Sequence, residues 1–174
     1  MGFLTPGKKS FRFKRIIAVA LLLTIFDGFI SGLPSFGFFI SAAVFVASAI
    51  ASVIFLFVDK GFSKLYAVKS LIYLWAGGCI IGMFALNTYV GSTNADQIIN
   101  SIEKYKADKG DYPAELRDLV PEYMPKIPVC AYRMLSNQYR YTYTETSHYL
   151  MYANLPPYGR RSYHFQNKEW IYID

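Results

Sequence analysis

The residue types that most often carry catalysis are scarce in this sequence. Residues 91–174 contain two histidines, His148 and His164, and one cysteine, Cys130. A cysteine beside a histidine base could act as a nucleophile, but none of the three lies in a local catalytic signature. Packing is the more frequent role, since a lone cysteine behaves as a small buried hydrophobe. We expect no catalytic residue and no enzyme activity, and rank a Cys130–histidine site last of three hypotheses.

Sites for cofactors and metals are not predicted either. The sequence has no glycine-rich phosphate loop, no Cys-x-x-Cys pair and no His-Glu-x-x-His motif. Its acidic residues follow helix faces and turns rather than forming a cluster that would bind a cation. We therefore expect no cofactor-binding residues and no metal.

Tyrosine is concentrated in residues 91–174, which hold twelve of the 15 tyrosines in the chain. A tyrosine ring can pack in a half-buried sheet while its hydroxyl stays in water, so sheet packing explains most of them. The alternative is that some of them form a binding face together with two arginines. The interaction candidates are Tyr139, Tyr141, Tyr143, Tyr158, Arg160, Arg161 and Tyr163.

Three apolar runs precede this tyrosine-rich region, at residues 16–33, 36–58 and 71–90. A helix of about 20 residues spans about 30 Å, the thickness of the hydrocarbon layer, so we expect three transmembrane helices. The first run follows a basic tail, as in a signal peptide, but no small-x-small cleavage site follows it, and we interpret it as an uncleaved anchor.

Asp27 is an intramembrane polar residue of the first run. A carboxylate in hydrocarbon costs a few kcal/mol or more, so it could bind a proton or an ion, or contact a partner helix. The alternative is a position in the outer third of a short span, close to water beside Gly28. A proton relay needs further polar partners, and the second and third runs contain no ionisable residue.

The charge distribution predicts the topology. Before Gly91 lie eight basic and two acidic residues, and after it lie ten of each, so the net charge of +6 belongs to the membrane half. This excess argues against a nucleic-acid partner and follows the positive-inside rule. We expect a basic cytoplasmic tail (1–15), a transmembrane region (16–90) in the lipid bilayer of a bacterial inner membrane, and a periplasmic domain (91–174).

The periplasmic domain is predicted to be α+β. Apolar residues at helical spacing between Ala95 and Tyr105 indicate a helix that packs on one face, capped at residues 92–94 and ended by Gly110. A short helix at 114–120 and an extended, proline-rich loop follow. Alternating residues then predict three or four antiparallel strands, with a longer connection at 155–162 and a hairpin turn near residues 167–168.

Three glycines in the last apolar run, Gly77, Gly78 and Gly82, offer a smooth helix face. Small residues four apart permit close packing of membrane helices, which could support an oligomer. Ordinary tolerance of glycine within a span is the alternative.

The run AdqIInsIEkYKadkGdYPaeLrdLvPeYmpkIP (95–128) resembles the soluble part of type IV pilin-like proteins, particularly the major pseudopilins of type II secretion. The resemblance implies a long helix, half in the membrane and half packed on a small antiparallel sheet. The residues that match the turn and short helix of that family are Gly110, Tyr112, Pro113, Leu116, Leu119 and Pro121. Two departures argue against polymerisation. The Gly61–Phe62 bond resembles the family's cleavage site, but it lies behind two spans and Tyr66 stands where the family has a glutamate, so we interpret it as coincidence or relic. The family's calcium loop is also missing.

From these features we predict a non-catalytic inner-membrane protein. It would present a pilin-like domain to an envelope protein, as an accessory component of a secretion or pilus system. An immunity protein that neutralises a toxin at the inner membrane or in the periplasm is the alternative. Its small size and several spans suit that role, but no residue requires it.

Overall fold

The structure, a computed structural model, describes residues 6–144, 147–155 and 159–173. Two compact units divide the chain, Met1–Phe84 and Ala85–Asp174. The boundary falls within the longest helix, α3 (Lys60–Lys109), so this helix contributes to both units.

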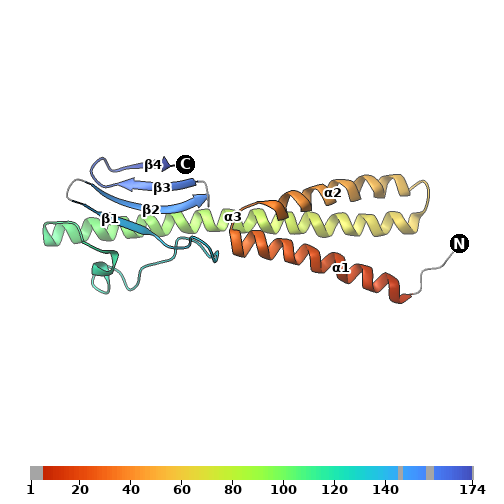
Figure 1. Cartoon of the computed structure of the whole chain (residues 1–174), viewed down its shortest axis with the longest axis horizontal. Coiled ribbons are helices and arrows are strands. Elements are labelled where there is room, and N and C mark those ends of the chain that lie inside the picture. The colour runs from red at the N-terminus through yellow and green to blue at the C-terminus, as the bar shows by residue number, and fades with distance from the viewer. Residues whose placement is uncertain (1–5, 145–146, 156–158, 174) are drawn as a thin grey trace. The chain divides into compact units, whose positions relative to one another are not determined.

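In the described part of the first unit, α-helices follow one another through short connections (Figure 1). Helix α1 spans Pro6–Ile25 and passes into a π-helical turn, η1, at Phe26–Ser31. Helix α2 spans Phe36–Phe55, after which α3 begins. The turn predicted around Pro34 is confirmed, because it lies between η1 and α2.

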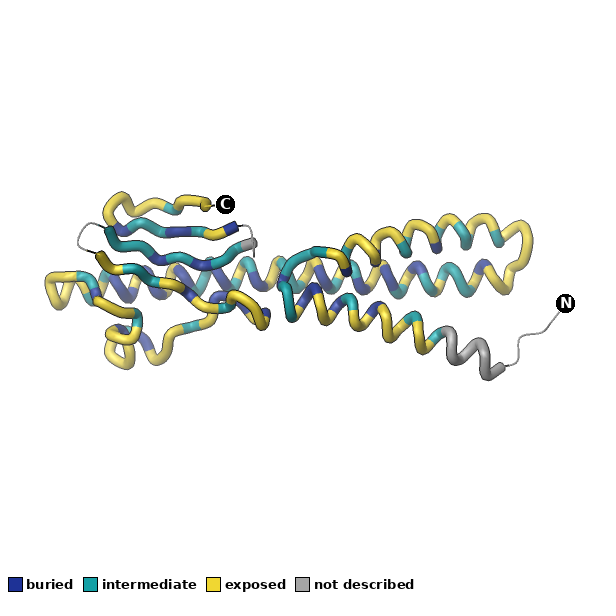
Figure 2. Tube along the Cα trace, viewed as in Figure 1, coloured by how far each residue is buried: buried dark blue, intermediate teal, exposed yellow. Residues whose placement is uncertain are grey.

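Among the described residues, two helices, α2 and α3, are long and apolar enough to cross a membrane. Their large apolar side chains are largely exposed: Phe39 is 67% exposed and Trp75 is 61% exposed. Figure 2 shows α2 mostly as exposed and half-buried positions. Soluble proteins rarely expose a continuous apolar surface of this size, so this surface favours a lipid environment.

Small and hydroxylated residues bring the helices of the first unit together. Ala20 of α1 is buried in one cluster with Tyr73 and Ala76 of α3. Near the loop between α2 and α3, Ser52 Oγ donates to the Ser63 carbonyl at 3.0 Å, and Ser63 Oγ donates to the Ser52 carbonyl at 2.9 Å. This reciprocal pair satisfies two hydroxyls that would otherwise be costly in an apolar setting.

Helix α3 runs without interruption from Lys60 to Lys109, so the prediction of a helix cap at residues 92–94 is wrong. The side chains there have other partners: the Ser92 hydroxyl donates to the Tyr89 carbonyl at 3.0 Å, within the helix. The predicted stop at Gly110 is confirmed. Its φ is 86°, a left-handed conformation that favours glycine, and its N–H donates to the Lys106 carbonyl at 2.9 Å.

Between α3 and the sheet, the chain forms a short helical turn and a long loop. The predicted helix at 114–120 is a shorter 3-10 helix, η2 (Leu116–Leu119). A capping box holds its start, where the Asp118 carboxylate accepts a hydrogen bond from the Glu115 N–H at 2.9 Å. Leu119 is fully buried and anchors the turn in the core. The proline-rich segment that follows is irregular, as predicted.

The second unit contains an antiparallel four-stranded sheet in the order β1-β2-β3-β4 (Figure 1). The strands are β1 (Arg140–Tyr143), β2 (His148–Leu155), β3 (Gly159–His164) and β4 (Glu169–Ile173). The α+β class and the antiparallel meander are therefore confirmed. The long connection predicted at 155–162 is wrong, because β3 already begins at Gly159 and pairs Arg160 with Ala153.

The core of the second unit lies between α3 and one face of the sheet. The predicted apolar stripe of the helix is confirmed: Ala95, Ile98 and Ile102 are fully buried. They share one cluster with Leu150 of β2 and Phe165, which follows β3. Burying a side chain of this size stabilises a fold by about 1.5–3 kcal/mol, so this contact holds the sheet on the helix.

Candidate functional site

The strand register decides which face of the sheet each candidate tyrosine occupies. Leu150 is buried in the core and pairs with Tyr141 on one side and Tyr163 on the other. Paired residues share a face of a sheet, and so do residues two apart in a strand. Tyr139 and Tyr143 therefore lie on the same face as Tyr141. These four candidates point toward the α3 side of the sheet rather than forming a separate outer surface.

Two of these tyrosines bond to the chain around α3. Tyr139 is buried, and its hydroxyl donates to the Gly91 carbonyl at 2.6 Å. The Tyr143 hydroxyl donates to the Asp111 carboxylate at 3.2 Å. Both bonds position the sheet against the helix. The remaining tyrosine candidate, Tyr158, lies outside the described residues.

The two candidate arginines lie on opposite faces of β3. Arg161 pairs with the buried Tyr152, and its guanidinium carbon lies 5.0 Å from the centroid of the Trp170 ring, on the helix-facing side. Arg160 pairs with Ala153 and is exposed on the other face. Among the described candidates, Arg160 alone belongs to the face opposite α3, and it lines one hollow together with Tyr139 and Tyr141.

The face of the sheet opposite α3, named here the outer face, has no helix packed on it in the described structure (Figure 1). Alternation and register place apolar, aromatic and basic side chains on it. Its members are Arg140, Thr142, Tyr149, Met151, Ala153, Arg160, Ser162, His164, Glu169, Ile171 and Ile173. The Tyr149 and His164 rings stack with centroids 5.6 Å apart, and Ile171 and Ile173 are exposed. Exposed apolar side chains beside arginines are typical of protein interfaces.

A shallow hollow of about 570 Å³ lies beside the outer face. Met151 and Ala153 form part of its apolar lining, and Arg140 and Arg160 contribute two positive charges. The loop before β1 supplies polar groups, including Asn137. An apolar floor with two guanidinium groups can hold an apolar side chain next to a carboxylate.

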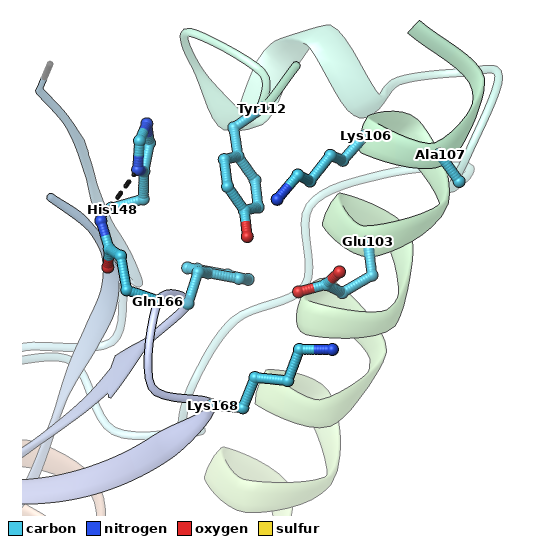
Figure 3. Close-up of a pocket in the computed structure, with 8 residues that line it drawn as sticks. Glu103, Lys106, Ala107, Tyr112, His148, Gln166 and Lys168 are labelled. Carbon is cyan, nitrogen blue, oxygen red and sulfur yellow. Dashed lines mark hydrogen bonds between the residues drawn. The ribbon is translucent and has the colours of Figure 1, made fainter. Parts of the chain in front are cut away.

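A second shallow pocket, of about 580 Å³, opens between the C-terminal end of α3 and the turn between β3 and β4 (Figure 3). Its lining residues are Glu103, Lys106, Ala107, Tyr112, His148, Phe165, Gln166 and Lys168. Two lysines face one glutamate there, so the pocket can hold a polar or anionic group. None of these lining residues is a serine, threonine or cysteine that could act as a nucleophile.

Aromatic and amide contacts hold the polar residues of this pocket in place. The Lys106 ammonium lies 4.0 Å from the centroid of the Tyr112 ring, and a hydrogen bond with Tyr112 is the main cause that raises the pKa of Lys106. His148 packs against the same ring at 4.6 Å. With the Gln166 amide oxygen turned toward His148, that oxygen accepts hydrogen bonds from His148 Nδ1 at 3.1 Å and from its backbone N–H at 2.9 Å. His148 therefore has a packing role.

The Cys130–histidine site is not assembled by the described contacts. The Cys130 thiol is buried and donates to the Ser136 carbonyl at 3.4 Å. Burial raises the pKa of this thiol, and nearby Arg133 lowers it in part. His148 and His164 lie on opposite faces of the sheet. Among the described residues, no three His, Cys, Asp or Glu side chains converge as metal ligands would.

Asp27 is fully buried and caps the start of α2. Its carboxylate accepts hydrogen bonds from the Ser35 N–H at 2.9 Å, the Ser35 hydroxyl at 2.7 Å and the Phe38 N–H at 2.8 Å. Asp27 lies in η1, close to the turn that leads into α2, and its side chain is enclosed by protein. The first N–H groups of a helix lack partners within the helix. The Asp27 carboxylate accepts hydrogen bonds from two such N–H groups at the start of α2, so the structure gives Asp27 a helix-capping role.

The glycine face of α3 is open in the structure. An added Cβ at Gly77, Gly78 or Gly82 would meet nothing within 4 Å, so no described helix packs closely on these glycines. A polar stripe of α3 that sequence reasoning missed lies further along, at Asn87, Gly91 and Asn94. The i, i+4, i+7 spacing of these residues is the signal that could have identified a face for close packing.

The loop before β1 packs along this polar stripe. The Asn87 amide oxygen accepts a hydrogen bond from the Tyr132 N–H at 2.9 Å, and the Asn94 amide donates to the Val129 carbonyl at 2.9 Å. Between them, Gly91 lets the loop approach, because an added Cβ would lie 2.9 Å from the Cys130 carbonyl oxygen. These contacts fix the loop on the helix.

Buried tyrosines make alkaline unfolding an expected property. Desolvation raises the pKa of half-buried Tyr123 to about 12, and it also raises the pKa values of buried Tyr139 and half-buried Tyr141 above the ordinary value near 10. The folded state holds these protons more tightly than the unfolded state. Their stabilisation is thus complete below about pH 10 and is lost as the pH rises through the raised values. Tyrosinate absorbance and circular dichroism of the full chain in detergent should show buried tyrosines ionising together with loss of structure. Ionisation of every tyrosine near pH 10 with the structure intact would contradict this.

The structure therefore offers an uncovered outer face and two shallow pockets, and it gives Asp27, Tyr139 and His148 structural contacts. Comparisons with protein-family models, curated proteins and solved structures give no match for this chain.

Proposed function

We propose that this protein is a membrane-anchored interaction module, which presents the outer face of its sheet to a protein partner. The observation that carries the proposal is the uneven covering of the sheet. Helix α3 packs on one face, whereas Met151, Ile171 and Ile173 lie on the opposite face with no helix over them among the described residues. Apolar side chains in such a position lower the free energy of a complex when a partner removes them from water.

The chemistry of the outer face favours a partner with an apolar and acidic surface. Arg140 and Arg160 line the hollow beside Met151, and Glu169 lies on the strand at the other side of the sheet. Guanidinium groups bind carboxylates in a bidentate manner and are enriched at interfaces. We infer that an acidic residue of the partner binds at the two arginines, while apolar residues cover Met151 and Ile171.

The proposed setting is a bacterial inner membrane crossed by all three apolar runs, with residues 91–174 in the periplasm. The positive-inside charge distribution supports this orientation, and the exposed apolar surfaces of α2 and α3 support membrane insertion. A long helix followed by an antiparallel meander is what a pilin-like domain would have, so the partner that we propose is an envelope protein of a secretion or pilus system. Binding, rather than catalysis, is the proposed role.

Photo-crosslinking in cells of the native host tests this proposal. A crosslinking amino acid in place of Ile171 should form an adduct with one discrete protein. Arg117 is a matched control, because it is exposed on η2 and lies outside the sheet. A second substitution, Met151→Asp, should reduce the adduct yield at Ile171 about tenfold, which corresponds to ~1.4 kcal/mol of binding free energy.

The identity of the adduct decides between the functions. A secretion or pilus component supports the accessory role, and a toxin would establish the immunity role instead. Equal yields at Ile171 and Arg117, or a yield that Met151→Asp leaves unchanged, would exclude the outer face as the binding surface.

A further inference from the structure

The loop between η2 and β1 exposes a group of large apolar side chains at its tip. Tyr132 is 59% exposed, Met134 is 74% exposed and Leu135 is 57% exposed. They are close together in the chain and are not part of the core cluster of this unit. Three exposed large apolar residues within four positions are unusual on a surface that faces water.

The one charged residue at this tip is turned away from its surface. Arg133 is 3% exposed, although it lies between two exposed residues. Its guanidinium donates to the Leu135 carbonyl at 2.9 Å and to the Ser136 carbonyl at 3.0 Å, and it also bonds to the Ala153 carbonyl. Backbone carbonyls thus hold the charge inside the fold, and the tip presents apolar groups.

The loop is fixed on α3 at a defined height. Tyr132 donates its N–H to Asn87, and Asn87 belongs to the uncharged run Leu71–Val90. At 1.5 Å per residue, Asn87 lies about 4.5 Å before the end of that run. The next charged residue of the helix, Asp96, is about 9 Å further along the axis than Val90. The apolar tip is therefore level with the end of the membrane-spanning segment.

We propose that the loop tip Tyr132–Leu135 inserts into the lipid interface of the bilayer that α3 crosses, as a second membrane contact of the second unit. This inference rests on the membrane anchoring in the proposed function and not on the protein partner. Tyr132 suits the interface, where an aromatic ring meets lipid and its hydroxyl meets water. Met134 and Leu135 enter the acyl boundary, as the apolar residues of interfacial segments do. The contact holds the unit at a fixed height and rotation on the membrane surface.

Fluorescence quenching of the full chain in phosphatidylcholine–phosphatidylglycerol vesicles tests the insertion. Met134→Cys, in a background with Cys79→Ala and Cys130→Ala, carries an environment-sensitive fluorophore. Lipids with a nitroxide on the acyl chain should reduce its emission about twofold, as for a group inserted at the acyl boundary. Aqueous iodide should have little effect.

Labels at two control positions show whether a negative result means that the loop tip is not inserted or that the chain is not anchored in the membrane. A label on Cys79, which lies in the uncharged run Leu71–Val90 of α3, reports the span itself when Cys130 is replaced by alanine. A label at Glu122→Cys reports exposed surface near Lys109, about 28 Å beyond Val90 along the helix axis, and should be quenched by iodide alone.

Each pattern of quenching has one meaning. Lipid quenching at Cys79 and Met134, but not at Glu122, supports insertion. Lipid quenching at Cys79 with iodide quenching at Met134 overturns the inference and leaves the anchor intact. Protection of Met134 from both quenchers also overturns it, because a protein, such as a second copy of the chain, would then cover the tip. If lipid nitroxides do not quench the label at Cys79, the proposed membrane anchor is contradicted together with the insertion of the loop tip.

Discussion

Replacing Asp27 with alanine is expected to lower the free energy of unfolding of the first unit by about 3 kcal/mol. The substitution removes the acceptor for two Ser35 groups and the Phe38 N–H, all at 2.9 Å or less. The carboxylate is fully buried and its hydrogen bonds are part-buried, so its removal leaves these donors without their acceptor in a site that water reaches only in part. Detergent-induced unfolding of the full chain in mixed micelles, followed by circular dichroism, measures the change.

Helix α2 has a glycine where it passes closest to the Asp27 carboxylate. An added Cβ at Gly37 would lie 2.9 Å from Asp27 Cγ and 2.9 Å from the Leu23 carbonyl oxygen. Glycine at position 37 therefore leaves the space that the buried carboxylate occupies. Asp27→Asn should lose less stability than Asp27→Ala, because its amide oxygen can still accept one of the hydrogen bonds.

Asp59 provides the matched control for Asp27. It also accepts a hydrogen bond from a backbone N–H at a helix start, that of Gly61 at 2.7 Å, but it is exposed. Asp59→Ala should cost about 1 kcal/mol, the usual effect of removing an exposed cap. If Asp27→Ala costs no more than Asp59→Ala, the buried cap is not a major source of stability and a functional role for Asp27 becomes the better explanation.

Replacing Gly91 with alanine is the second large expected effect, a loss of about 2 kcal/mol in the stability of the second unit. The new methyl group would lie 2.9 Å from the Cys130 carbonyl oxygen and 3.0 Å from Tyr152 Cε2. The carbonyl belongs to backbone that is itself fixed, since the Cys130 N–H donates to the Asn137 carbonyl at 2.9 Å. The loop would have to leave the helix. The near-ultraviolet circular dichroism of the tyrosines, recorded during thermal unfolding, reports the loss.

Gly78→Ala is the control for Gly91→Ala, because both glycines lie in α3. An added Cβ at Gly78 meets nothing within 4 Å, and alanine favours a helix over glycine by about 1 kcal/mol, so this substitution should leave stability unchanged or raise it by up to about 1 kcal/mol. Equal gains in stability at the two positions would mean that helix propensity, rather than contact with the loop, decides the result. A large effect of Gly78→Ala alone would instead point to a helix packed on the glycine face.

Local patterns of the sequence were sufficient to predict much of the fold. The stripe of Ala95, Ile98 and Ile102 predicted the buried face of α3, because the helical period places residues three and four apart on one side. Gly110 predicted the helix end because a left-handed residue favours glycine. Alternation around Tyr141 predicted a half-buried strand, because successive strand residues point to opposite faces.

Other features depended on residues far apart in the chain. Alternation showed that Tyr139, Tyr141 and Tyr143 share a face, but their pairing with β2 was needed to show that this is the α3 side. The early start of β3 was missed because its pairing with β2 outweighs the weak strand signal of the Gly159 region.

The sequence by itself determined the apolar runs, the amphipathic helix and the antiparallel meander, since each depends on the spacing of neighbouring residues. Only the tertiary structure decided the role of Asp27, the contact of Asn87 with Tyr132 and the inward turn of Arg133. The physical reason is that a polar side chain in an apolar setting takes its role from its hydrogen-bond partners. For Asp27 and Asn87, those partners come from other elements of the fold.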